Sequence, residues 1–64
     1  MITLTRLNDK GLVVNAELIK FVESTPDTLI TMINGDRLVV KESLEEVVRK
    51  AVEYGRQVRA FVAQ

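Results

Sequence analysis

The sequence predicts an α+β domain in which a small antiparallel sheet of four to five strands precedes one C-terminal α-helix. Up to Val40, short runs that alternate apolar and polar residues are separated by turn-forming residues, which is the pattern of strands joined by hairpins. From Ser43 onward the apolar period changes from two residues to 3.6, the period of an amphipathic helix. At 64 residues the chain has room for a single domain, which we place at 1–64.

The first predicted strand covers residues 2–7, where apolar and polar side chains alternate and two threonines favour extended backbone. Residues 8–11 are four turn formers in a row, so the second strand, 12–22, returns beside the first as a hairpin. Asn15 interrupts this second strand. Its side chain either caps a single helical turn or marks a bulge, and a break there raises the number of strands from four to five.

The central hairpin is predicted to pair residues 29–33 with residues 36–40 around Asn34-Gly35. This dipeptide suits the two-residue type I′ turn, which needs a positive φ at both positions. With that turn one face holds Ile30, Met32 and Val39 with Arg37, and the other holds Leu29, Ile33, Leu38 and Val40 with Thr31 and Asp36. Because both faces are then apolar and only one helix is available, we expect another copy of the chain to cover the second face.

The helix is predicted over about 44–63, with Ser43 and Glu46 as a capping box and the pairs Glu45–Arg49 and Glu46–Lys50 along its surface. Its apolar stripe comprises Leu44, Val47, Val48, Ala51, Tyr54 or Gly55, Val58, and Phe61 or Val62. A helix of this length spans about 30 Å, whereas short strands span about 17–20 Å. The last turns should therefore overhang the sheet, and Gly55 marks a kink, a close helix–helix approach or the end of the helix.

Self-association is the expected source of additional stability. A domain of this size has a small core and usually needs disulfides, a metal or a partner subunit. The chain contains no cysteine and no histidine, which excludes disulfides and argues against zinc. We therefore predict a homo-oligomer, and its expected contact is the apolar part of the late helix, formed by Tyr54, Val58, Phe61 and Val62.

No catalytic constellation is present in the sequence, so we predict a protein that is not an enzyme and has no cofactor, metal site or small-molecule substrate. The nine basic and nine acidic residues cancel, which argues against a nucleic-acid partner because nucleic-acid binders usually carry a basic surplus. The first residues lack the basic start and apolar run of a signal peptide. No apolar segment approaches the ~20 residues that a membrane span requires, and we expect a cytoplasmic location.

Three arginines form the candidate surface for a partner protein. Arg37 stands in a predicted strand among apolar neighbours, either as an edge residue that lays its stem on apolar surface or as one half of an intersubunit ion pair. Arg56 and Arg59 give the late helix a basic character. That character either serves solubility alone or provides a docking surface for an acidic protein segment.

Several short motifs follow one another through the chain: TRLN at 5–8, NAELI at 15–19, TPDT at 25–28, Asn34-Gly35, VVKES at 39–43 and EEVV at 45–48. In this order and without large gaps, they resemble the FlbD/SwrD family of bacterial flagellar proteins. The resemblance implies a small cytoplasmic protein, associated with the cytoplasmic side of the flagellar motor or its stator, that supports torque and swarming through protein contacts. The tail, 56–64, departs from the family in being longer and more apolar.

Two weaker resemblances imply an alternative function, a small RNA- or DNA-binding regulator of flagellar gene expression. Residues 1–6 are similar to the opening of the CsrA/RsmA RNA-binding regulators, although the basic patch that precedes the helix in those proteins is replaced here by KESLEE at 41–46. The run from Asn34 to Leu44 is similar to the hairpin-to-helix step of LytTR-type DNA-binding domains. The chain is too short for a whole domain of that type.

Overall fold

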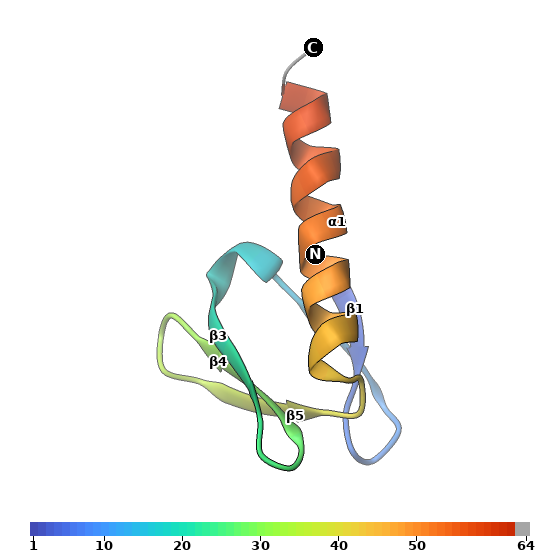
Figure 1. Cartoon of the computed structure of the whole chain (residues 1–64), viewed down its shortest axis with the longest axis vertical. Coiled ribbons are helices and arrows are strands. Elements are labelled where there is room, and N and C mark those ends of the chain that lie inside the picture. Colours follow the sequence, from blue (N-terminus) through green and yellow to red (C-terminus); the bar gives the residue numbers. More distant parts are fainter. Residues whose placement is uncertain (63–64) are drawn as a thin grey trace.

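The fold is an α+β arrangement of two small sheets and one long helix (Figure 1), and a computed structural model describes it for residues 1–62, with side chains for residues 1–59. The elements in chain order are β1 (Ile2–Thr5), β2 (Gly11–Val14), the 3-10 helix η1 (Ala16–Leu18), β3 (Ile19–Ser24), β4 (Thr28–Met32), β5 (Arg37–Val40) and α1 (Leu44–Val62). The predicted fold class is confirmed. Residue 63, the expected end of the helix, lies outside the described residues.

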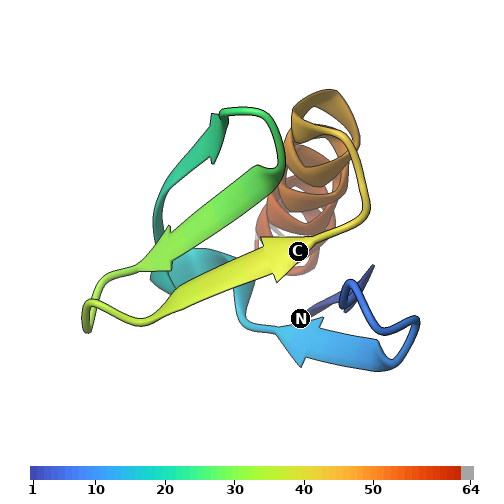
Figure 2. The ribbon, with the colours of Figure 1, turned by 90° about the horizontal axis from the view of Figure 1, so that it is seen from below.

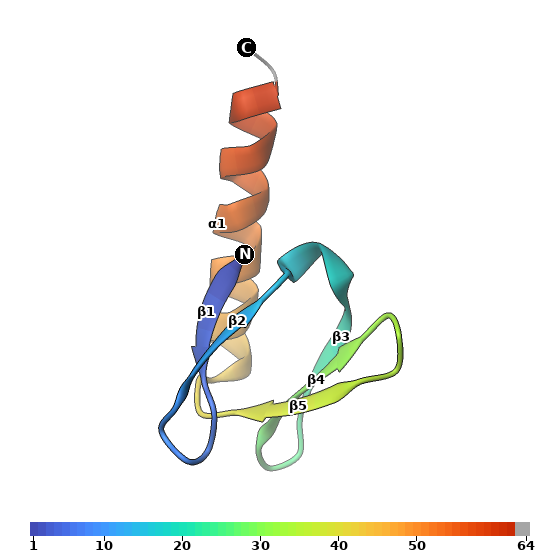
Figure 3. The ribbon, with the colours of Figure 1, turned by 180° about the vertical axis from the view of Figure 1, so that it is seen from behind.

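The strands form two antiparallel sheets, a β1–β2 hairpin and a β3–β4–β5 meander. A single bridge between Arg6 and Val40 joins them, next to a hydrogen bond of 2.8 Å from the N–H of Lys41 to the carbonyl of Thr5. Viewed from below, the meander and the hairpin lie beside each other with the helix rising behind them (Figure 2). The β1 end of one sheet and the β5 end of the other are therefore adjacent, as Figure 3 also shows.

Asn15 breaks the predicted second strand, and the alternative with five strands is the correct one. Its side chain accepts a hydrogen bond of 3.0 Å from the N–H of Glu17 and caps η1. The N–H of Leu18 then bonds to the carbonyl of Asn15 at 3.0 Å, which completes the single turn. The prediction of one continuous strand over 12–22 is wrong, because this short side chain offers the backbone a local partner.

The turn of the central hairpin has three residues, Ile33, Asn34 and Gly35, and the prediction of a two-residue type I′ turn is wrong. The N–H of Met32 bonds to the carbonyl of Asp36 at 2.8 Å, and the N–H of Gly35 bonds back to the carbonyl of Met32 at 2.9 Å. Gly35 has a φ of +94° and Asn34 has a negative φ. One left-handed glycine at the end of the turn is the usual form of a three-residue hairpin loop.

This longer turn shifts the strand register by one residue and exchanges the faces that the sequence predicted. Leu38 lies opposite Ile30, and Arg37 lies opposite Thr31. The face toward the core therefore carries Thr28, Ile30, Met32, Leu38 and Val40. The opposite face carries Leu29, Thr31, Arg37 and Val39, of which Arg37 and Val39 are exposed whereas Thr31 is buried. The expected groupings of Ile30 with Val39 and of Leu29 with Leu38 are wrong, because a slip of one residue moves the side chains of β5 to the other face relative to those of β4. The argument for a covering copy at this hairpin disappears with them.

The core is small and lies between the two sheets and the first turns of α1. Both sheets and the helix contribute to it, and its buried apolar members are Ile2, Leu4, Val14, Ile30, Val40 and Val47. Helix α1 contacts β1 and β3. It then continues without interruption through Gly55 to Val62, and its later turns extend beyond the sheets as predicted (Figure 1).

Candidate functional site

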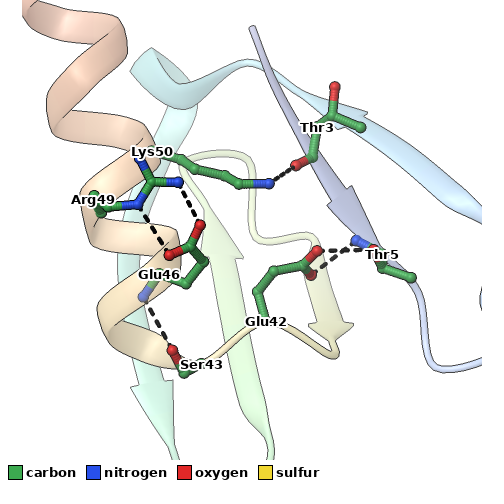
Figure 4. A network of polar contacts seen from close by, with 7 residues as sticks. All are labelled: Thr3, Thr5, Glu42, Ser43, Glu46, Arg49 and Lys50. Carbon is green, nitrogen blue, oxygen red and sulfur yellow. Dashed lines mark hydrogen bonds and ion pairs between the residues drawn. The ribbon is translucent and has the colours of Figure 1, made fainter.

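The start of α1 is held to strand β1 by a group of polar contacts (Figure 4). The hydroxyl of Ser43 accepts a bond of 3.1 Å from the N–H of Glu46, as the capping motif predicted. The ammonium of Lys50 donates to the carbonyl of Thr3 at 2.7 Å. The carboxylate of Glu42 accepts from both the N–H and the hydroxyl of Thr5, at 2.9 and 2.8 Å. These contacts set the direction in which the helix leaves the sheets.

The ion pairs on the helix surface differ from those predicted. Glu46 pairs with Arg49, three residues away, and the Nε of Arg49 lies 3.0 Å from its carboxylate. The predicted pairs Glu45–Arg49 and Glu46–Lys50 do not form, because Arg49 turns toward Glu46 and Lys50 reaches the backbone of β1 instead. The Glu46 carboxylate is also engaged with Arg49 and does not return to the N–H of Ser43 as a full capping box would require.

Two carboxylates have a pKa below the ordinary value. At Glu42, burial acts to raise the pKa, but the hydrogen bonds from Thr5 and the charge of Lys50 outweigh burial and lower it. At Glu46, the hydrogen bond from Arg49 lowers the pKa, and the same bond raises the pKa of the Arg49 guanidinium. A carboxylate with a lowered pKa stays ionised and is a weak base. Glu42 thus ties the link before α1 to β1, whereas the bond of Glu46 to Arg49 lies within α1 itself.

Of the predicted oligomer contact, the structure describes the side chains of Tyr54 and Val58. Tyr54 is half-buried and packs against the edge of the core, beside Met1 and Ile2 at the start of the chain. Val58 is half-buried. The side chains of Phe61 and Val62 lie outside the described residues. A role of these four residues in association stays a prediction.

The three predicted arginines are all exposed, but the structure does not bring them together. Arg37 lies on the outward face of β5, opposite Thr31. Arg56 and Arg59 lie in the part of α1 that extends away from the sheets, at the other end of the molecule (Figures 1 and 3). The molecule therefore has two separate basic regions, and the helical region is the one that carries two charges.

An apolar groove runs between α1 and strand β3. The apolar stripe predicted from the sequence contained only one of its two exposed valines. Val48 was expected in the apolar stripe, but Val52 was not, although it follows Val48 by four residues and shares its side of the helix. Both side chains are exposed. The groove measures about 320 Å³ and is lined by Ala16, Ile19, Val22, Val47, Val48, Ala51, Val52, Gly55 and Arg59.

A second apolar opening of about 350 Å³ lies between β2 and the turn of the β4–β5 hairpin. Leu12, Met32 and Leu38 are half-buried there and pack against the core. Three exposed side chains, Val13, Leu18 and Ile33, also line this opening. Sequence reasoning missed it, because it exists only where the two sheets diverge and only with the register that the three-residue turn creates.

The part of the chain that the structure describes contains neither a group of metal-ligating side chains nor a helix that could span a membrane. Within residues 1–62, acidic side chains do not gather in groups of three or more as metal ligands do. Over the same residues, α1 is too polar for its length to cross a bilayer.

Comparison with known proteins identifies one family. The family model described as FlbD, flagellar and swarming motility proteins, matches residues 1–59. The match contains all five strands and α1 as far as Arg59, and it stops within the tail that the sequence had set apart. No curated protein and no solved structure matches the chain.

Proposed function

The chain belongs to the FlbD family of flagellar and swarming motility proteins, and from this premise we propose that it is a non-enzymatic accessory that supports flagellar motor power through protein–protein contacts. A role in flagellar or swarming motility follows from the family itself. The proposal adds the mechanism: the protein binds other proteins, including copies of itself, on the cytoplasmic side of the motor.

The observation that carries the proposal is the amount of apolar surface on so small a molecule. Among the described residues, six apolar side chains are buried in the core, whereas nine large apolar side chains are exposed. Five of these nine line two hollows of the surface: Val48 and Val52 the groove beside α1, and Val13, Leu18 and Ile33 the opening beside β2. Exposed apolar patches on a soluble domain usually mark surfaces that other molecules cover.

The polar residues favour binding over catalysis. The chain has no cysteine or histidine to act as nucleophile or general base. The carboxylates of Glu42 and Glu46 have a lowered pKa and are already bonded, the first to Thr5 and the second to Arg49. The charged surface that we assign to a partner is the pair Arg56 and Arg59 near the end of the helix. An acidic protein segment, such as a cytoplasmic segment of a stator component, complements it.

Deletion of the gene tests this proposal. We expect filaments of normal number and length, reduced swarming and reduced torque of single tethered motors, with full recovery when the gene is restored. Loss of filaments would contradict a role in motor power. A change in flagellar messenger levels, together with retention of flagellar leader RNA in a filter-binding assay at moderate salt, would instead support the RNA- or DNA-binding alternative.

A further inference from the structure

We propose that two copies of the chain associate through α1, with the helices antiparallel and crossing near Val52. The proposal rests on the self-association included in the proposed function and specifies its surface and orientation. The surface is the exposed side of α1 beside β3, which we call the valine face and define by Glu45, Val48, Val52, Gly55 and Arg59. It differs from the contact at Tyr54 and Val58 that the sequence suggested.

The centre of the valine face, formed by Val48 and Val52, is apolar but uncovered. Val48 and Val52 are 45% and 46% exposed, although Val47, the residue just before Val48, lies in the core with no exposure. The apolar arc of α1 is therefore wider than the part that the sheets cover. Val48 and Val52 also line the groove beside β3, so a second helix laid along them would meet apolar side chains of both α1 and β3.

Gly55 is an independent indication that a second helix approaches the backbone of α1 closely. It lies within α1, where glycine is about 1 kcal/mol less favourable than alanine. The fold of the single chain gives no reason for this cost. An added Cβ would meet only the flexible guanidinium of Arg59, at 3.9 Å, and no backbone atom. Gly55 is half-buried and lines the groove beside β3, three residues after Val52, and a glycine there permits the backbone of a neighbouring helix to come near.

The charges of the valine face are complementary to themselves only in the antiparallel orientation. Glu45 and Arg59 each lie seven residues from Val52, one before it and one after it. Seven residues are about two helical turns, so the three side chains lie along one side of α1. When two antiparallel helices cross at Val52, Glu45 of each copy lies beside Arg59 of the other. A parallel pair would place Glu45 beside Glu45 and Arg59 beside Arg59, which is repulsive.

The occupant is therefore a second copy of this chain, since the same surface provides both halves of the charge pattern about its own centre. Within the described residues, Glu45 makes no ion pair, and the two pairs that form are Lys41–Asp9 and Glu46–Arg49. The side chain of Arg59 rests over Gly55 in the single chain. It has only to swing away from that glycine to reach the second copy.

Sedimentation equilibrium of the full chain between 1 and 200 µM tests the contact. We expect a monomer–dimer equilibrium, and we expect Gly55→Ala to raise its dissociation constant at least tenfold while the helix content and thermal midpoint of the dilute monomer stay the same or rise. This opposite response separates a lost contact from a damaged fold. Val52→Lys should also abolish the dimer. Val13→Lys is the matched control and should not, because it changes the same residue type at an even more exposed position, on β2.

Disulfide trapping tests the orientation, because the chain has no cysteine of its own. A mixture of Glu45→Cys and Arg59→Cys chains should form the mixed disulfide, and Glu45→Cys alone should not form a linked dimer. Efficient linkage of Glu45→Cys to itself would overturn the antiparallel orientation. A dimer that survives both Gly55→Ala and Val52→Lys would overturn the valine face as the contact. A monomer at 200 µM would overturn self-association altogether, and none of these outcomes alters the motility test of the proposed function.

Discussion

The carboxylate of Glu42 binds Thr5 with both of its oxygens, accepting from the backbone N–H at 2.9 Å and from the hydroxyl at 2.8 Å. The two residues are 37 positions apart in the chain. Glu42 belongs to the short link between β5 and α1, and Thr5 is the last residue of β1. This contact therefore joins the two sheets at the point where the helix begins, and it fixes the helix over the core.

We predict that the contribution of Glu42 to stability depends on pH. Its pKa in the folded chain lies below the ordinary value of 4.5, so the contribution is complete above that value and is lost as the pH falls through the folded pKa. Because the carboxylate is partly solvated, the effect of Glu42→Gln at pH 7 should be about 1 kcal/mol or less. Urea unfolding at pH 7 and at pH 3 measures it. If Glu42→Gln lowered the free energy of unfolding equally at pH 7 and at pH 3, the charge of Glu42 would make no contribution to stability.

Thr31→Val should stabilise the protein. Thr31 is 8% exposed, and its hydroxyl has no hydrogen-bond partner among the described residues. A buried unpaired hydroxyl costs about 1–3 kcal/mol, so we expect the free energy of unfolding to rise by about 1 kcal/mol. The matched control is Thr5→Val, which removes a hydroxyl that Glu42 uses and should lower stability. A fall in stability for Thr31→Val would show that its hydroxyl has a partner in solution.

Gly35→Ala should destabilise the central hairpin, because Gly35 has a φ of +94°. A left-handed conformation costs a residue with a Cβ about 1–2 kcal/mol. Gly11→Ala is the control, since Gly11 has no positive φ and has open space at the Cβ position. Thermal unfolding of the two variants compares them. Similar losses at both positions would argue against the turn described here.

Charge reversal at the end of α1 should impair motility and leave the fold intact. Arg56→Glu together with Arg59→Glu removes the basic region that we propose for an acidic partner, and swarming should fall toward that of the deletion. Arg37→Glu reverses an equally exposed arginine at the other end of the molecule and should swarm normally. Full motility of the double variant would eliminate this partner surface.

Because Arg59 also belongs to the valine face, Arg56→Glu alone separates partner binding from self-association. This variant should reduce swarming while the dimer persists in sedimentation. Loss of swarming only when Arg59 is reversed, together with loss of the dimer, would assign the effect to self-association.

The sequence by itself determined the elements whose signals are local. Ser43 caps α1, Asn15 caps η1 and Gly35 ends the hairpin turn, and each does so through contacts with residues no more than four positions away. The apolar period likewise predicted the helix and its overhang, and the succession of short motifs predicted the family. These features need no knowledge of the rest of the fold, because their hydrogen bonds close within one turn of chain.

The tertiary structure alone decided which residues meet across the molecule. One extra residue in the turn at Gly35 shifted β5 by one position along β4. Because side chains alternate along a strand, the side chains of β5 then lie on the other face relative to those of β4. Lys50 binds the carbonyl of Thr3, not Glu46, because β1 lies within its reach. Only the fold shows that Val48 and Val52 are uncovered, because the sequence contains apolar residues on both sides of the arc and does not tell which side the sheets cover. The two sheets cover one side and leave Val48 and Val52 exposed.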